Sequence, residues 1–102
     1  MSKKYQRGER KDAILTAAID LSIRDGYKQI TRDSIAIHAG VSTGLVNRHY
    51  GTMTQLRRAI MRAAIAREIH QIIAQGLAAG DIYARNAPDE LKKQATDYLF
   101  GR

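Results

Sequence analysis

The sequence contains no cysteine, which excludes disulfides and thiolate chemistry and fits a reducing cytoplasm. It has no apolar run of membrane-spanning length, and its start, MSKKYQRGERK, is charged and lacks the apolar core of a secretion signal. It also lacks low-complexity tracts and repeats of solenoid period. A length of 102 residues suffices for one modest core, so we expect a single small domain. Because the sequence has no membrane span and no secretion signal, we expect a cytoplasmic protein without a membrane partner.

The residue types that catalysis or metal binding needs are scattered along the chain. His38, His49 and His70 have no cysteine partner and do not show the i, i+4 spacing of a zinc-binding helix. Ser22 and Ser42 have no histidine and aspartate placed to activate them, and glycine-rich phosphate loops are absent. We therefore expect no enzyme activity, no metal site and no cofactor.

Alternating strand patterns of useful length are missing as well, and apolar residues recur instead at helical spacing, so the expected fold class is all-α. A first helix is predicted over about residues 9–25, where the apolar residues share one face and Gly26 ends the helix. It would belong to a three-helix bundle, with the other two helices in the segment that follows.

Residues 31–56 have the pattern of two short helices around a tight turn, followed by the capped start of another helix. Thr31 is placed to cap the first of these helices, and Gly40 can take the positive φ that ends it. Ser42 can then cap the second helix. This is a helix-turn-helix, a motif that presents its second helix to the major groove of DNA.

Positive charge accompanies this motif. The chain has 17 Lys and Arg against 10 Asp and Glu, and residues 1–58 hold 11 of the basic and 5 of the acidic side chains. Residues 59–102 are nearly neutral, with 6 basic and 5 acidic side chains. The asymmetry favours double-stranded DNA as the partner. A flexible basic leader at residues 1–8 would follow DNA phosphates or remain a solvated tail.

The rest of the chain predicts two more helices. Thr52 and Gln55 fit a capping box, so a long fourth helix should begin there and run to Gly76 or Gly80. A short fifth helix should begin at Pro88, whose fixed φ suits a first helical turn. Apolar residues cover more of these helices than one neighbour can bury, which favours a homodimer. The interface residues expected are Ile65, Ile69, Ile72, Ile73, Leu77, Leu91, Tyr98 and Leu99.

An ordered set of residues runs through residues 10–60, and it is more specific than any single member. It comprises Ile14-Leu15, Ala17-Ala18, Gly26, Thr31, Ile35-Ala36, Ala39-Gly40-Val41-Ser42, Gly44, Tyr50 and Leu56. In this order the residues resemble the N-terminal DNA-binding domain of TetR-family transcriptional regulators. The resemblance implies binding of palindromic operators as a dimer, with a larger helical C-terminal domain that usually holds an inducer pocket.

The resemblance also implies which residues contact DNA. Asn47 stands where the family commonly has a tyrosine, which alters the detailed docking. Met53 stands where a lysine often touches phosphate, which removes one ionic contact. The implied contacts are Thr31, Arg32, Ser42, Thr43, Gly44, Asn47, Arg48, His49, Tyr50, Thr52 and Thr54.

Several of these residues have an alternative role. Asn47 is suited to an adenine edge but also to solvent, and Arg48 or His49 can cover apolar surface instead of facing the groove. Tyr50 suits the core of the bundle, with a phosphate contact as a secondary role. Gly44 lets the helix approach DNA closely or is a tolerated weak spot.

We interpret the sequence as a DNA-binding region at residues 9–58 and a helical dimerisation region at residues 59–102. Two helices cannot readily enclose a cavity of about 300 to 1,000 Å³, so a small-molecule effector is not expected. The function predicted is a dimeric transcriptional repressor. The alternatives are a non-specific or architectural DNA-binding protein, and a helical module that binds a protein partner or an anionic membrane surface.

Overall fold

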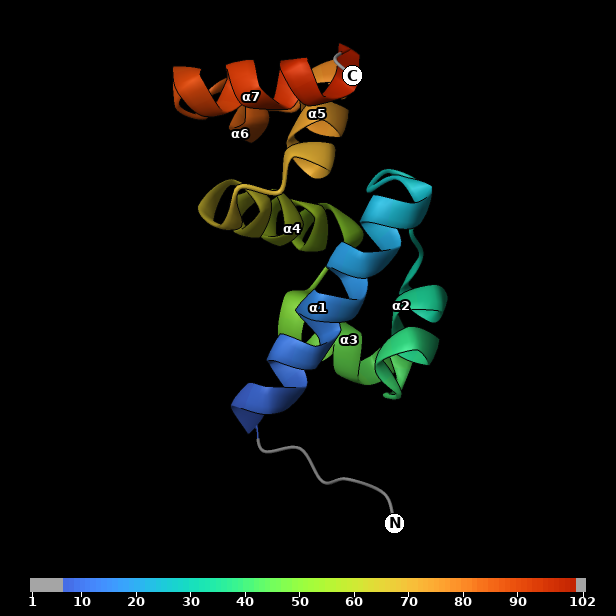
Figure 1. The fold of residues 1–102 in the computed structure, drawn as a ribbon. Coiled ribbons are helices and arrows are strands. Elements are labelled where there is room, and N and C mark those ends of the chain that lie inside the picture. Colours follow the sequence, from blue (N-terminus) through green and yellow to red (C-terminus); the bar gives the residue numbers. More distant parts are fainter. Residues whose placement is uncertain (1–6, 101–102) are drawn as a thin grey trace.

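The computed structural model describes residues 7–100, and within that range the chain forms seven α-helices and no strand (Figure 1). The all-α prediction is confirmed, while the leader predicted at residues 1–8 lies mostly outside the described residues. The helices are α1 (Arg7–Asp25), α2 (Arg32–Ala39), α3 (Thr43–Tyr50), α4 (Met53–Arg67), α5 (His70–Ala79), α6 (Ile82–Arg85) and α7 (Asp89–Phe100).

Side-chain caps begin the helices of the motif where the sequence predicts them. The Thr31 hydroxyl accepts a hydrogen bond from the Ser34 backbone N–H at 3.1 Å, and the Ser42 hydroxyl caps α3 in the same way. Thr52 and Gln55 form a reciprocal capping box, with bonds of 3.1 and 2.8 Å. These bonds satisfy N–H groups that a helix start otherwise leaves unpaired, so short local patterns suffice to predict the boundaries.

The turn between α2 and α3 depends on a left-handed residue. Gly40 has φ 74°, and its N–H bonds to the carbonyl oxygen of Ile37 at 3.2 Å while the next N–H, from Val41, reaches that of Ala36 at 3.0 Å. A glycine adopts this conformation without a Cβ clash. The chain therefore turns within three residues and enters α3 at Ser42.

The prediction of one long fourth helix is wrong beyond Arg67. Glu68 has φ 56° and ψ 48°, and it is the only non-glycine residue with positive φ among those described. The N–H of Ile69 donates to the Ala64 carbonyl at 2.8 Å, which closes the end of α4. Figure 1 shows α5 leaving the end of α4 in a new direction. No glycine or proline marks the break, which is why the sequence did not reveal it.

A short helix, α6, also escaped prediction. The Asp81 carboxylate accepts backbone N–H bonds from Tyr83 and Ala84 at 2.8 and 3.0 Å and so caps it. The last helix, α7, follows Pro88 directly, as predicted, and has Asp89 and Glu90 in its first turn. Its acidic start matches the positive end of the helix dipole.

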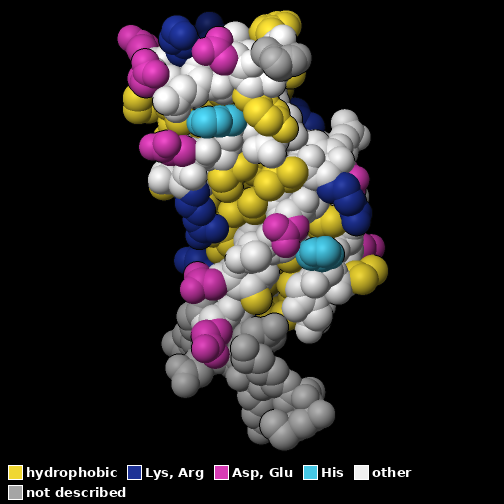
Figure 2. All heavy atoms as spheres, in the orientation of Figure 1, with side chains coloured by type: hydrophobic (Ala, Val, Ile, Leu, Met, Phe, Trp, Pro, Cys, Tyr) yellow, Lys and Arg dark blue, Asp and Glu magenta, His cyan; other side chains and the backbone are white. Residues whose placement is uncertain are grey.

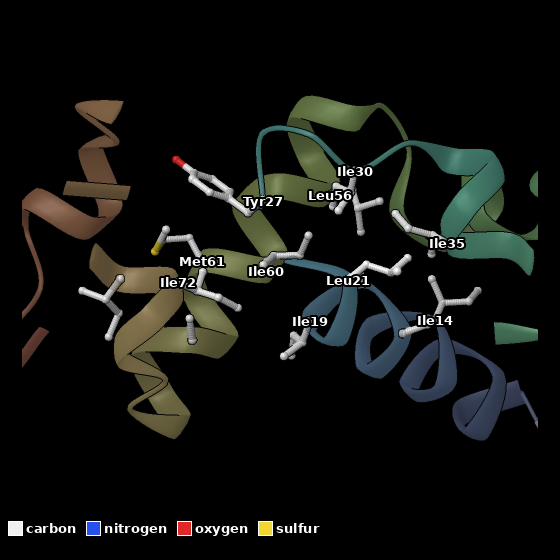
Figure 3. Packing of buried hydrophobic residues seen from close by; sticks show 14 of the residues in the cluster. Ile14, Ile19, Leu21, Tyr27, Ile30, Ile35, Leu56, Ile60, Met61 and Ile72 are labelled. Carbon is white, nitrogen blue, oxygen red and sulfur yellow. The ribbon is translucent and has the colours of Figure 1, made fainter. Parts of the chain in front are cut away.

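One hydrophobic core extends from the motif into the C-terminal helices. Figure 3 shows Ile14 and Ile35 at one end of this cluster, Ile60 between, and Met61 and Ile72 at the other end. Each of the five side chains has no exposed surface. The core therefore crosses residue 58, where the sequence placed the boundary between two regions.

This core corrects part of the predicted dimer interface. Ile72 and Ile73 have no exposed surface, and Leu91 is only 7% exposed. These three side chains are covered within the single chain, because the break after Arg67 lets α6 and α7 fold over α5. They have almost no exposed surface to offer a second subunit.

The turn after α1 is bonded to the C-terminal helices. The N–H of Tyr27 donates to the Gln75 side-chain oxygen at 2.8 Å, and its hydroxyl donates to Asp81 at 3.1 Å. Gln75 in turn donates to the Ser22 carbonyl at 3.0 Å, and Arg57 donates to the Tyr27 carbonyl at 3.3 Å. Burial, followed by the Asp81 carboxylate, raises the pKa of Tyr27 to about 12, so its hydroxyl remains a donor at neutral pH.

Replacing Glu68 by Gly and by Ala tests the left-handed turn. A Cβ in this conformation costs about 1 to 2 kcal/mol, so we expect Glu68→Gly to have an unfolding free energy about 1 kcal/mol above that of Glu68→Ala. Chemical denaturation of both variants measures the difference. A continuous helix would reverse the order, because glycine in a helix interior is about 1 kcal/mol worse than alanine.

Candidate DNA-binding surface

Helix α3 has one buried, apolar side and one exposed, polar side. Val46 is 1% exposed, whereas Gly44, Asn47 and Arg48 are exposed. With about 3.6 residues per turn, Gly44 and Arg48 lie opposite Val46, and Asn47 and the half-buried His49 lie on the two flanks. The helix is thus held by its apolar side and presents a polar one to the exterior.

The Asn47 flank of α3 faces a hollow that α2 and α4 complete. Its volume is about 420 Å³, and it is lined by Thr31, Arg32, Asp33, Thr43, Asn47 and Met53. Four of the residues predicted to contact DNA, from the starts of α2 and α3 and from the middle of α3, therefore meet at one place. Met53, which stands where a phosphate-binding lysine was expected, lines the same hollow.

Arg32 carries a polar atom that the protein leaves without a partner. Its Nε is buried and has no hydrogen-bond partner among the described residues. Buried donors are nearly always bonded, so an unpaired one at the rim of a hollow is suited to an acceptor from outside. Arg32 is also the first residue of α2, where the helix dipole favours negative charge.

Thr52 and Thr54 are both exposed at the start of α4 but are placed differently. The Thr52 hydroxyl accepts the Gln55 backbone N–H, so it already has an internal role as a cap. Thr54 lines a separate hollow of about 150 Å³ with Tyr27, Arg57 and other residues. The structure therefore does not bring Thr54 together with Thr31, Thr43 and Asn47.

The other flank of α3 faces α1. The Tyr50 hydroxyl donates to the Lys11 carbonyl at 3.0 Å, and the Lys11 ammonium lies 5.6 Å from the centre of the Tyr50 ring. Burial, with a smaller contribution from Asp12, raises the pKa of Tyr50 to about 12. These contacts support a role for Tyr50 within the bundle and not the alternative role as a phosphate contact.

This flank joins His49, one of the residues predicted to contact DNA, to basic residues that were not predicted to belong to a site. Lys11, Arg58 and Arg62 line a hollow of about 460 Å³ together with His49, Tyr50 and Tyr83. Arg58 and Arg62 are four residues apart and share one face of α4, a spacing visible in the sequence once the helix is accepted. What the sequence did not reveal is that α1 and α3 bring a lysine and a histidine to the same face.

No described helix is both long enough and apolar enough to cross a bilayer, and residues 7–100 contain no group of three potential metal-binding side chains. No curated protein and no solved structure matches the chain significantly. The model of one family, described as bacterial regulatory proteins of the tetR family, matches residues 14–60, from within α1 to within α4. Residues 14–60, a little under half of the chain, therefore match the N-terminal helix-turn-helix domain of bacterial tetR-family regulators.

Proposed function

We propose that this protein is a cytoplasmic repressor that binds a palindromic operator as a homodimer and excludes polymerase from an overlapping promoter. The observation that carries the proposal is the surface formed by the exposed face of α3 and the adjoining hollow at the start of α2. Such a surface would insert a helix into a major groove and receive phosphates beside it.

Sequence preference would come from the exposed side of α3. Asn47 can bond bidentately to adenine, and Arg48 can do the same to guanine. Both side chains are exposed, and no hydrogen bond or ion pair among the described residues occupies them. The proposal that they contact base edges thus needs no internal contact to be broken.

Phosphate contacts would come from the start of α2. The Thr31 hydroxyl and the Arg32 guanidinium lie at its N-terminal end, where the helix dipole adds partial positive charge. The unpaired Arg32 Nε is buried, so it would gain a phosphate acceptor only when the side chain turns toward the DNA. These contacts would orient α3 without reading sequence.

Dimerisation would use the apolar surface that the single chain leaves exposed. Tyr98 and Leu99 are each 54% exposed at the end of α7, and Ile65, Ile69 and Leu77 are only partly buried. Figure 2 shows hydrophobic side chains gathered across the middle of one face, between charged residues. A two-fold pair would cover such surface and hold two recognition helices about 34 to 36 Å apart, or a multiple of this distance.

Sequence preference is tested by selecting binding sites from random duplexes and then replacing single residues. Asn47→Ala and Arg48→Ala should each weaken binding to the selected site by about 1 to 3 kcal/mol and change non-specific binding much less. Arg85→Ala, an exposed arginine on α6, controls for the lost charge. Recovery of no preferred sequence, or equal losses on selected and random DNA, would indicate a non-specific DNA-binding protein.

Gly44→Ala separates a structural role of this glycine from a role at the DNA surface. A Cβ at this position would meet only the Ser42 hydroxyl, at 3.9 Å, so nothing in the protein requires glycine. Because alanine is up to about 1 kcal/mol better in a helix, the variant should be more stable. If α3 approaches DNA closely here, the same variant should bind the operator more weakly.

Gly76→Ala is the matched control. Its Cβ would overlap Met61 and Ala84, so this variant should lose stability. Thermal melting and operator titration of both variants measure the two effects. A Gly44→Ala protein that is more stable and binds DNA as tightly as the wild type would exclude a close approach at this residue.

Leu99→Asp tests the dimer. The charge should oppose burial of the α7 surface against a second copy, so the variant should sediment as a monomer and bind the palindromic site more weakly while its helical circular dichroism is kept. Ile37→Asp is the control, because Ile37 is 81% exposed on α2, away from this surface. A wild-type protein that stays monomeric at micromolar concentration, with and without operator, would overturn the dimer.

A further inference from the structure

The basic hollow, defined above by Lys11, His49, Arg58 and Arg62, has no role in the proposed operator contacts. It is bounded by α1, α3, α4 and α6, and its volume of about 460 Å³ falls within the range of small-molecule sites. Its walls come mainly from the motif helices. The basic hollow is therefore a different feature from an effector cavity enclosed by the C-terminal helices, which was not expected from the sequence.

Among the described residues, none of those that line this hollow carries a carboxylate. The Asp12 carboxylate lies close enough to Tyr50 to raise its pKa, but it is not part of the lining. Among the described side chains, Lys11, Arg58 and Arg62 take part in none of the ion pairs, which join Arg24 to Asp25, His38 to Asp20, Lys92 to Asp89 and Lys93 to Asp97. Like charges that face a common space repel one another, and an anion in that space would relieve the repulsion.

Several contacts hold the lining in place before any ligand arrives. Tyr50 is bonded to the Lys11 carbonyl, and the Lys11 ammonium lies above its ring. The Gln55 side chain is held by the Thr52 N–H at 2.8 Å. Arg58, one turn further along α4, presents a guanidinium whose planar fork can bond two oxygens of one phosphate.

We propose that the basic hollow binds the phosphate group of a small phosphorylated molecule. Arg58 and Arg62 would contact the phosphate oxygens, Lys11 would add charge, and Tyr50 and Tyr83 would border the rest of the ligand. A DNA backbone phosphate supplies the same chemistry, so the experiment separates these two sources. Protein without DNA is tested first, and this part does not depend on the proposed function.

Inorganic pyrophosphate is the probe, titrated by calorimetry at constant ionic strength. We expect saturable binding by the wild type, and at least tenfold weaker binding by Arg58→Gln and Arg62→Gln. Arg85→Gln is the matched control, since it removes the same charge from an exposed α6 residue outside the hollow and should bind like the wild type. Absence of saturable binding, or an equal loss in Arg85→Gln, would overturn the proposal.

A second arm identifies the source of the phosphate and rests on the proposed DNA binding. If a backbone phosphate fills the hollow, Arg62→Gln should reduce the slope of log K for duplex DNA against log salt by about 0.9. If a free ligand fills it, the slope should stay unchanged and pyrophosphate should still bind through Arg62. A reduced slope would overturn the small-molecule ligand and assign the hollow to the DNA backbone.

Discussion

The arrangement of the whole chain depends on how the turn after α1 is held. Tyr27 is 2% exposed, and its backbone and hydroxyl bond to residues of α4, α5 and the α6 cap. All three bonds involve side chains far along the sequence, those of Arg57, Gln75 and Asp81. A hydrogen bond to a charged group contributes about 1.5 to 3 kcal/mol, so the bonds of Arg57 and Asp81 are among the stronger constraints available. They fix the C-terminal helices against the motif.

Features that depend on local residues could be predicted from the sequence, whereas features that depend on long-range packing could not. Thr31, Ser42 and Thr52 cap helices within three or four residues, and Gly40 ends one, so the motif could be predicted from short patterns. The end of α4 could not, because Glu68 carries no signal for a left-handed turn. That turn is favoured by packing elsewhere, including the close contact of α5 with α4 and α6 at Gly76. Tertiary context thus overrides helix propensity here.

The same distinction between local pattern and long-range packing applies to the two hollows and to the apolar surface. Thr31, Arg32, Thr43 and Asn47 were predicted to act together from a family resemblance, and the structure gathers them around one hollow. Their contact with DNA stays a prediction. The basic hollow was missed because its basic side chains come from three helices, and the sequence does not show which faces of α1, α3 and α4 meet. For the apolar residues, periodicity identified a buried face but could not distinguish burial within the chain from burial between subunits.

Electrostatics connects the two hollows. They lie on opposite flanks of α3, one lined by Asn47 and the other by His49. A recognition helix about 10 to 12 Å across separates them by slightly more than the screening length of about 8 to 10 Å at physiological salt, so coupling between exposed charges across it is largely screened there. At low salt, where the screening length rises to about 30 Å, a phosphate bound beside His49 would lower the positive potential that DNA meets at α3. Binding at one flank and binding at the other would then oppose each other, and by linkage the opposition would be equal in both directions.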